Sequence, residues 1–155
     1  MLRMFSSFMY IWVIFFWVSW KLPMGLPNCS RTFAYLAASS NAHSAQPIGS
    51  FQLTQKKITQ MYIKLENMRN MVYNCAQDID AGRSARISSA MCKYYCGKAT
   101  QEVIDDAMQV LGAIGYAEDH RVSRLWRASR CNRIGGGTDE IMIHILGRQL
   151  LKQFK

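Results

Sequence analysis

The sequence is poor in acidic residues, and the few it has are unevenly placed. Of its 155 residues, 10 are Asp or Glu and 19 are Lys or Arg, so the formal net charge is +9. All the acids lie between Glu66 and Glu140, and the first fifty residues contain none. This balance suits a nucleic acid, an anionic membrane or a phosphate-bearing cofactor without choosing among them. A hydrophobic content of 50% excludes a disordered chain.

Two other kinds of pattern are missing. The five cysteines show no CxxC spacing and only three histidines accompany them, which supports neither a disulfide framework nor a structural zinc site. A reducing compartment is the simpler interpretation. No stretch alternates apolar and polar residues as a half-buried strand does, so an all-α fold is expected.

The first 21 residues form a hydrophobic segment of their own. Residues 4–20 are aromatic and aliphatic, carry no charge, and at 17 residues lie at the lower limit for crossing a bilayer. We expect an extra N-terminal helix here, interpreted either as a short membrane anchor or as a non-native start. Residues 22–46 collect Pro, Gly, Ser and Asn and are predicted to be a linker.

Residues 47–155 are predicted to fold as an antiparallel four-helix bundle. Apolar residues at spacings of three and four predict a long first helix from about residue 51, which ends at Asp80-Ala81-Gly82. The second helix, capped by Ser84 or Ser88, runs to Gly112, the third covers 122–130, and the fourth begins near Thr138. The first helix's apolar stripe is Ile58, Met61, Leu65, Met68, Val72, Cys75 and Ile79.

Three features could carry chemistry. An arginine at every third position predicts a basic band, which we interpret as a solvated or interface face; its members are Arg121, Arg124, Arg127, Arg130 and Arg133. Nucleic-acid binding is disfavoured because the band's only aromatic residue, Trp126, is expected to pack inward. Gly135-Gly136-Gly137-Thr138 precedes a helix and could present backbone N–H groups to an anion, or Thr138 could simply be an N-cap. Cys92 and Cys96 are expected to be core thiols.

Three segments together resemble the C-terminal helical domain of the acyl-CoA dehydrogenases. They are Gln109-Val-Leu-Gly-Ala-Ile-Gly-Tyr116, Asp119-His-Arg-Val-Ser-Arg-Leu-Trp-Arg127 and Arg133-Ile-Gly-Gly-Gly-Thr-Asp-Glu-Ile-Met142. Pro47-Ile-Gly-Ser-Phe-Gln52 resembles the start of that domain's first long helix, and Ala90-Met-Cys-Lys-Tyr-Tyr-Cys-Gly-Lys98 resembles its second core helix. Residues 41–155 match in order, and the glycine before Gly-Thr resembles the long-chain and isovaleryl branch.

The resemblance implies a flavoenzyme that dehydrogenates acyl-CoA thioesters with FAD. It implies oligomers with acyl-CoA dehydrogenase subunits and electron transfer to an electron-transferring flavoprotein. The location would be mitochondrial in a eukaryote, cytoplasmic in a bacterium, or membrane-associated if residues 4–20 insert. Carried over by position, the cofactor-binding residues are Gln52, Gln109, Gly112, Ala113, Thr138 and Glu140.

Departures from the family's pattern predict that this chain alone is inactive. Gly136 stands where many members have the catalytic glutamate, and glycine cannot abstract a proton. Asn41, Ser44 and Ala45 stand where members commonly have an arginine and a Phe-Gly pair, and Ala113 replaces a second glycine. The chain also resembles only the last third of a complete member. The alternative function is a membrane-tethered basic helical module that is not an enzyme.

Overall fold

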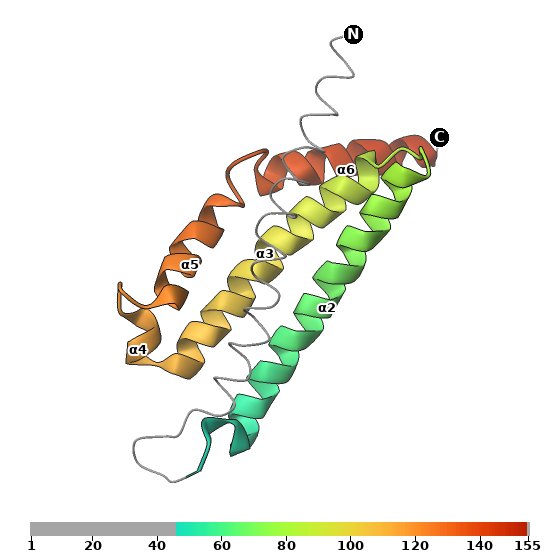
Figure 1. Ribbon diagram of the computed structural model, residues 1–155. Helices are drawn as coiled ribbons and strands as arrows, with labels where there is room; N and C mark the ends of the chain where they lie inside the picture. The colour runs from blue at the N-terminus through green and yellow to red at the C-terminus, as the bar shows by residue number, and fades with distance from the viewer. Residues whose placement is uncertain (1–45, 155) are drawn as a thin grey trace.

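The computed structural model describes residues 46–154, which contain helices and no strand. A 3-10 turn, η1 (Ile48–Ser50), precedes the long helix α2 (Gln52–Asp80), which is followed by α3 (Arg86–Leu111). A short helix α4 (Ala113–Tyr116), α5 (Arg121–Cys131) and α6 (Asp139–Gln153) complete the chain (Figure 1). The all-α fold and the four main helices are therefore as predicted, and α4 is an addition. The expected N-terminal helix and the 22–45 part of the linker lie outside the described residues.

Helices α2 and α3 lie side by side and antiparallel (Figure 1). Lys57 on α2 pairs with Asp106 on α3 at 2.7 Å, and Lys64 pairs with Glu102 at 2.8 Å. The apolar stripe predicted for α2 lies at the interface between the two helices. Its buried members are Met61, Leu65, Met68 and Cys75. Since an amphipathic helix buries the face where apolar residues recur, the period read from the sequence correctly placed this core.

The turn between α2 and α3 depends on the backbone conformation of Gly82. Gly82 has φ +67°, a conformation that L side chains rarely adopt. The Arg83 N–H donates to the Asp78 carbonyl at 2.8 Å, and the Gly82 N–H donates to the Ile79 carbonyl at 3.0 Å. These two bonds are those of a Schellman C-cap, so the predicted end of the first helix is confirmed.

Helix α3 is the central element, because α2, α4, α5 and α6 all pack against it. Its buried positions are small, namely Ala90, Cys92, Gly97, Ala99, Val103 and Ala107. Helix α5 continues the core through Val122, and α6 lies across α3 near the end where α2 finishes (Figure 1). Short side chains let several helices approach one helix closely.

Several expectations about individual side chains were wrong. The N-cap of α3 is Ala85, without a side-chain cap, and neither Ser84 nor Ser88 fills that role. Trp126 does not pack inward: it is 39% exposed, and its indole N–H donates to Asp105 at 3.1 Å. A polar tip with a carboxylate partner lets this aromatic ring remain at the surface.

The burial pattern yields a matched pair of methionine variants. Met61 is fully buried between α2 and α3, so Met61→Ala should lower the free energy of unfolding by about 2–5 kcal/mol through lost burial and the cavity left behind. Met91→Ala, at a side chain of α3 that is 45% exposed, should change it by less than about 0.5 kcal/mol. Urea unfolding followed by circular dichroism measures both, and equal losses would contradict the assigned core.

Candidate functional site

The glycine-rich loop between α5 and α6 has a backbone that only glycine adopts easily. Gly136 and Gly137 have φ values of +67° and +106°. The loop ends at Thr138, whose hydroxyl oxygen accepts from the Ile141 N–H at 3.4 Å as the N-cap of α6. The predicted helix start at Thr138 is therefore confirmed, with Asp139 and Glu140 in the first turn complementing the helix dipole.

The side chain of Lys93 on α3 donates hydrogen bonds to both ends of this loop. Its ammonium donates to the Asn132 carbonyl at 2.6 Å and to the Gly137 carbonyl at 2.9 Å. Burial lowers the pKa of Lys93, and the nearby carboxylate of Asp139 opposes that shift. Two carbonyls of the loop, 39 and 44 residues from Lys93 in the sequence, thus depend on one charged donor.

Arg133 makes the second attachment of the loop. Its guanidinium donates from Nε to Asp139 at 2.7 Å and from Nη1 to Gln101 at 3.0 Å, and its Nη2 lies 2.6 Å from the same Asp139 oxygen. Asp139 is buried, at 8% exposed. The arginine spacing predicts that Arg133 belongs to a basic band on a solvated or interface face, and for Arg133 this prediction is wrong. It lies beyond α5 and pairs inward, whereas the other four arginines of the band are exposed on α5.

Glu140 faces solvent beside this network. Hydrogen bonds from its own backbone N–H and from the Thr138 hydroxyl lower the pKa of Glu140, and Arg133 and Arg130 add to the effect. The Glu140 carboxylate therefore stays ionised near neutral pH, with the cations Arg133 and Arg130 close by. Its oxygens can accept hydrogen bonds from donor groups of a ligand, and they repel a phosphate placed directly against them.

The other predicted cofactor residues lie at the opposite end of the α2–α3 pair. Gln109, Gly112 and Ala113 are exposed where α3 ends and α4 begins, and Gln52 is exposed at the start of α2 (Figure 1). Lys93 and Leu111 are separated along α3 by about 27 Å at 1.5 Å per residue. The six predicted site residues thus form two surfaces on one chain and no single pocket.

Gly112 makes the second surface accessible to a ligand. Its φ is +63°, and a Cβ built there would meet no atom within 4 Å. The absence of a side chain leaves space next to the exposed amide of Gln109. The Gly112 N–H itself donates to the Met108 carbonyl at 2.9 Å, so the side-chain amide of Gln109 is the group through which this surface could donate to a phosphate.

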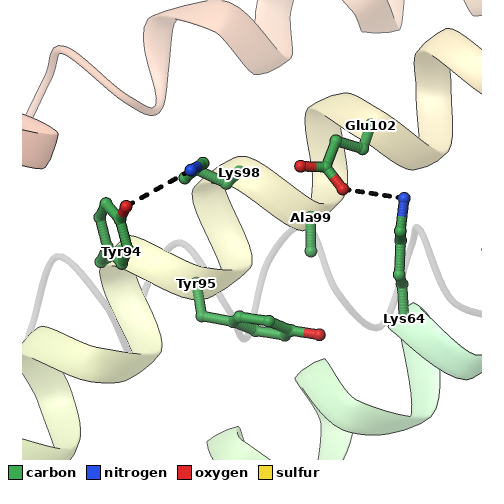
Figure 2. A pocket seen from close by; sticks show the side chains of 6 residues that line it. All are labelled: Lys64, Tyr94, Tyr95, Lys98, Ala99 and Glu102. Carbon is green, nitrogen blue, oxygen red and sulfur yellow. Dashed lines mark hydrogen bonds and ion pairs between the residues drawn. The ribbon is translucent and has the colours of Figure 1, made fainter.

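A separate cavity of about 160 Å³ lies between α2 and α3 (Figure 2). Its lining includes the ion pair of Lys64 with Glu102, and Lys98, whose ammonium donates to the Tyr94 hydroxyl at 3.4 Å. No predicted site residue lines it. Among residues 46–154, no cluster of three His, Cys, Asp or Glu side chains could hold a metal ion, and no helix is long and apolar enough to cross a membrane.

Sequence reasoning missed the residues that hold the glycine loop. Lys93 and Gln101 contact positions 32 to 44 residues away, and no local motif marks such contacts. The nearest signal is Gly97, where an added Cβ would lie 3.4 Å from the Arg133 side chain. A buried glycine within a helix is typical of a close approach by another segment.

Removing the Lys93 ammonium tests its role in the loop. Lys93→Met should lower the free energy of unfolding by about 1–3 kcal/mol, because the Asn132 and Gly137 carbonyls lose a donor. It should also speed hydrogen exchange at residues 133–138. Lys98→Met removes a lysine from the next turn of α3 and should leave exchange in the loop unchanged. Equal exchange rates in both variants would refute the assignment.

Known proteins share this architecture. An acyl-CoA dehydrogenase from Slackia heliotrinireducens superposes with a TM-score of 0.73 at 40% identity, covering 81% of this chain and 32% of that one. The butyryl-CoA dehydrogenase of Megasphaera elsdenii gives 0.74 at 25% identity, covering 79% of this chain and 32% of that one. The FAD complex of PigA gives 0.75 at 27% identity, covering 81% and 33%.

Sequence comparison agrees with these superpositions. The probable acyl-CoA dehydrogenase YdiO of Escherichia coli K12 is 47% identical over 131 residues, which is 84% of this chain and 34% of the relative. The chain thus spans about a third of the length of the relatives it matches. The family model described as acyl-CoA dehydrogenase, C-terminal domain, matches residues 25–151, which include most of the predicted linker. The chain belongs to the acyl-CoA dehydrogenase C-terminal domain family.

Proposed function

We propose that this chain serves in the FAD-dependent α,β-dehydrogenation of an acyl-CoA thioester, as the helical domain that contacts the flavin cofactor and other subunits. The observation that carries the proposal is the exposed Gln109–Ala113 turn. It combines an available amide with a glycine of positive φ at the positions that the family resemblance assigns to FAD. The family membership supports the reaction class, and the PigA relative named as an FAD complex supports the cofactor.

The two surfaces suit different parts of FAD. The uncharged Gln109 amide and the open space at Gly112 fit the pyrophosphate, whereas the negative charge of Glu140 disfavours it. Thr138 and Glu140 instead fit hydrogen-bond donor groups of FAD. Gln52 lies at the end of the α2–α3 pair that we assign to the pyrophosphate. FAD would supply the acceptor for the hydride that leaves the acyl β-carbon. Because the surfaces lie at opposite ends of one chain, we infer that two copies contribute to each cofactor.

The base that takes the α-proton does not come from position 136. Gly136 has φ +67°, so a glutamate there would adopt a conformation that L residues avoid. This agrees with the long-chain and isovaleryl branch, to which we assign the chain. The isolated 155-residue chain is accordingly proposed to be inactive, and it requires a carboxylate from elsewhere in an assembly.

Exposed apolar side chains support association with further subunits. On α2 and α6 they include Leu53 at 81%, Ile63 at 53% and Leu151 at 68% exposed. Apolar surface of this kind is typical of interfaces. We propose that it meets acyl-CoA dehydrogenase subunits, and that an electron-transferring flavoprotein accepts the electrons from the assembled enzyme.

The experiment that tests the proposal is flavin binding. The chain is purified alone and after co-expression with the full-length Escherichia coli relative, and bound flavin is measured by absorbance and by FAD titration. Flavin-containing mixed oligomers are expected. A Gln109→Ala chain should bind FAD about 10-fold to 100-fold more weakly, the loss expected for a hydrogen bond to a charged group.

Gln77→Ala is the matched control, because Gln77 is exposed near the other end of α2 and belongs to neither surface. It should leave FAD affinity and the circular dichroism spectrum unchanged. Strictly monomeric chains that take up no flavin in either setting would refute the proposed function.

A second variant tests the conclusion about the base. Gly136→Glu should not create dehydrogenase activity, and it should lower stability by about 1–2 kcal/mol because of the positive φ. Acyl-CoA turnover with an artificial electron acceptor and urea unfolding measure the two effects. Turnover by the variant chain alone would show that the loop accepts a catalytic carboxylate and would overturn the branch assignment.

A further inference from the structure

Two thiols of α3 lie side by side beside the lysine that holds the glycine loop. The Sγ atoms of Cys92 and Cys96 are 3.7 Å apart, one helical turn from each other. Both cysteines are free in the structure. Lys93, which lies between them in sequence, donates to the loop carbonyls of Asn132 and Gly137. No part of the proposed dehydrogenation uses these sulfurs.

The two thiols have different surroundings. Cys92 is buried, at 1% exposed, whereas Cys96 is partly exposed. The hydrogen bond between them lowers the pKa of Cys96 and raises that of Cys92, and burial further raises the latter. Since the thiolate is the nucleophile, Cys96 is the sulfur that reacts first, and Cys92 is within reach to resolve the product.

We propose that Cys92 and Cys96 form a modification site for hydroperoxides, at which they are oxidised to a reversible disulfide within α3. The Cys96 thiolate attacks a peroxide oxygen, which forms an S–O bond and breaks the O–O bond. The departing oxygen takes a proton and leaves as an alcohol or as water. Cys92 then loses its proton and attacks the Cys96 sulfur, and hydroxide leaves and becomes water. In total, the two thiols lose two electrons and the hydroperoxide gains them.

The helix must deform for this bond to form. Residues four apart on a helix have Cβ atoms about 5–6 Å apart, whereas a disulfide requires about 3.5–4.5 Å. The turn from Cys92 to Cys96 therefore tightens, and the resulting strain makes the disulfide easy to reduce again. Because this turn carries Lys93, oxidation displaces the donor that holds the glycine loop.

The consequence is a loop whose order depends on the redox state of α3. In the reduced protein Lys93 holds residues 132–137, and in the oxidised protein this attachment is weakened. That the change alters flavin contact rests on the proposed function. The thiol chemistry does not, so it can be tested without cofactor or substrate.

Trypsin separates the two states directly. It cleaves after Lys93, so reduced protein yields Ile87–Lys93 and Tyr94–Lys98 as separate peptides. The full chain is treated with hydrogen peroxide, its remaining thiols are alkylated, and the digest is analysed by mass spectrometry. We expect the two peptides joined, with a mass lower by two hydrogen atoms than their sum, and recovery of the separate peptides after dithiothreitol.

Three variants act as controls. Cys96→Ser, at the partly exposed position, should abolish the joined peptide, and Cys92→Ser should stop the reaction at an oxidised Cys96. Cys131→Ser removes an exposed thiol of α5 and should leave the joined peptide unchanged. Circular dichroism establishes that each variant is folded. Oxidation confined to Cys131 in the wild-type chain, with Cys92 and Cys96 still alkylated, would overturn the proposal.

Hydrogen exchange tests the link to the loop. Peroxide should speed exchange at residues 133–138 in the wild-type chain and in Cys131→Ser, and dithiothreitol should restore the original rate. Cys96→Ser should show no such change. A joined peptide without faster exchange would retain the modification site and refute its effect on the loop.

Discussion

The close packing of other helices around α3 is the constraint on which the rest of the structure depends. Its buried positions include Ala90, Gly97, Ala99 and Ala107, which leave room for α2 on one side and for α5 and α6 on others. Larger side chains there would push these helices apart, because protein interiors are packed without spare volume. The position of the glycine loop follows, since Arg133 lies directly beside Gly97.

Two charged side chains then hold the glycine loop in place against α3. Lys93 satisfies carbonyls at both ends of the loop, and Arg133 joins the loop to Gln101 and Asp139. Both cations are partly buried, where an absent partner costs more than a present one contributes. The loop is therefore ordered by tertiary contacts although its own sequence is flexible. The same dependence makes it sensitive to changes in the α3 turn that carries Lys93.

The arrangement of the proposed cofactor residues explains why one chain offers two incomplete surfaces. Gln109 and Gly112 are at one end of the long pair and Thr138 and Glu140 are near the other (Figure 1). In the proposed function, other subunits or domains complete each of these surfaces. Family membership and exposed apolar residues on α2 and α6 agree with such a role.

The sequence by itself determined the four main helices and most of their ends, because these depend on local properties; it predicted neither α4 nor the start of α3 at Ala85. The three-and-four spacing from Ile58 to Ile79, the positive φ that favours glycine at position 82 and the cap at Thr138 are read along a single segment. Motif resemblance also placed the chain in its family. The exposure of Trp126, the inward pairing of Arg133, the Lys93 attachment and the 3.7 Å approach of two thiols were decided by the tertiary structure. Each depends on which side chains neighbouring turns and helices bring together, and sequence spacing alone does not encode those distances.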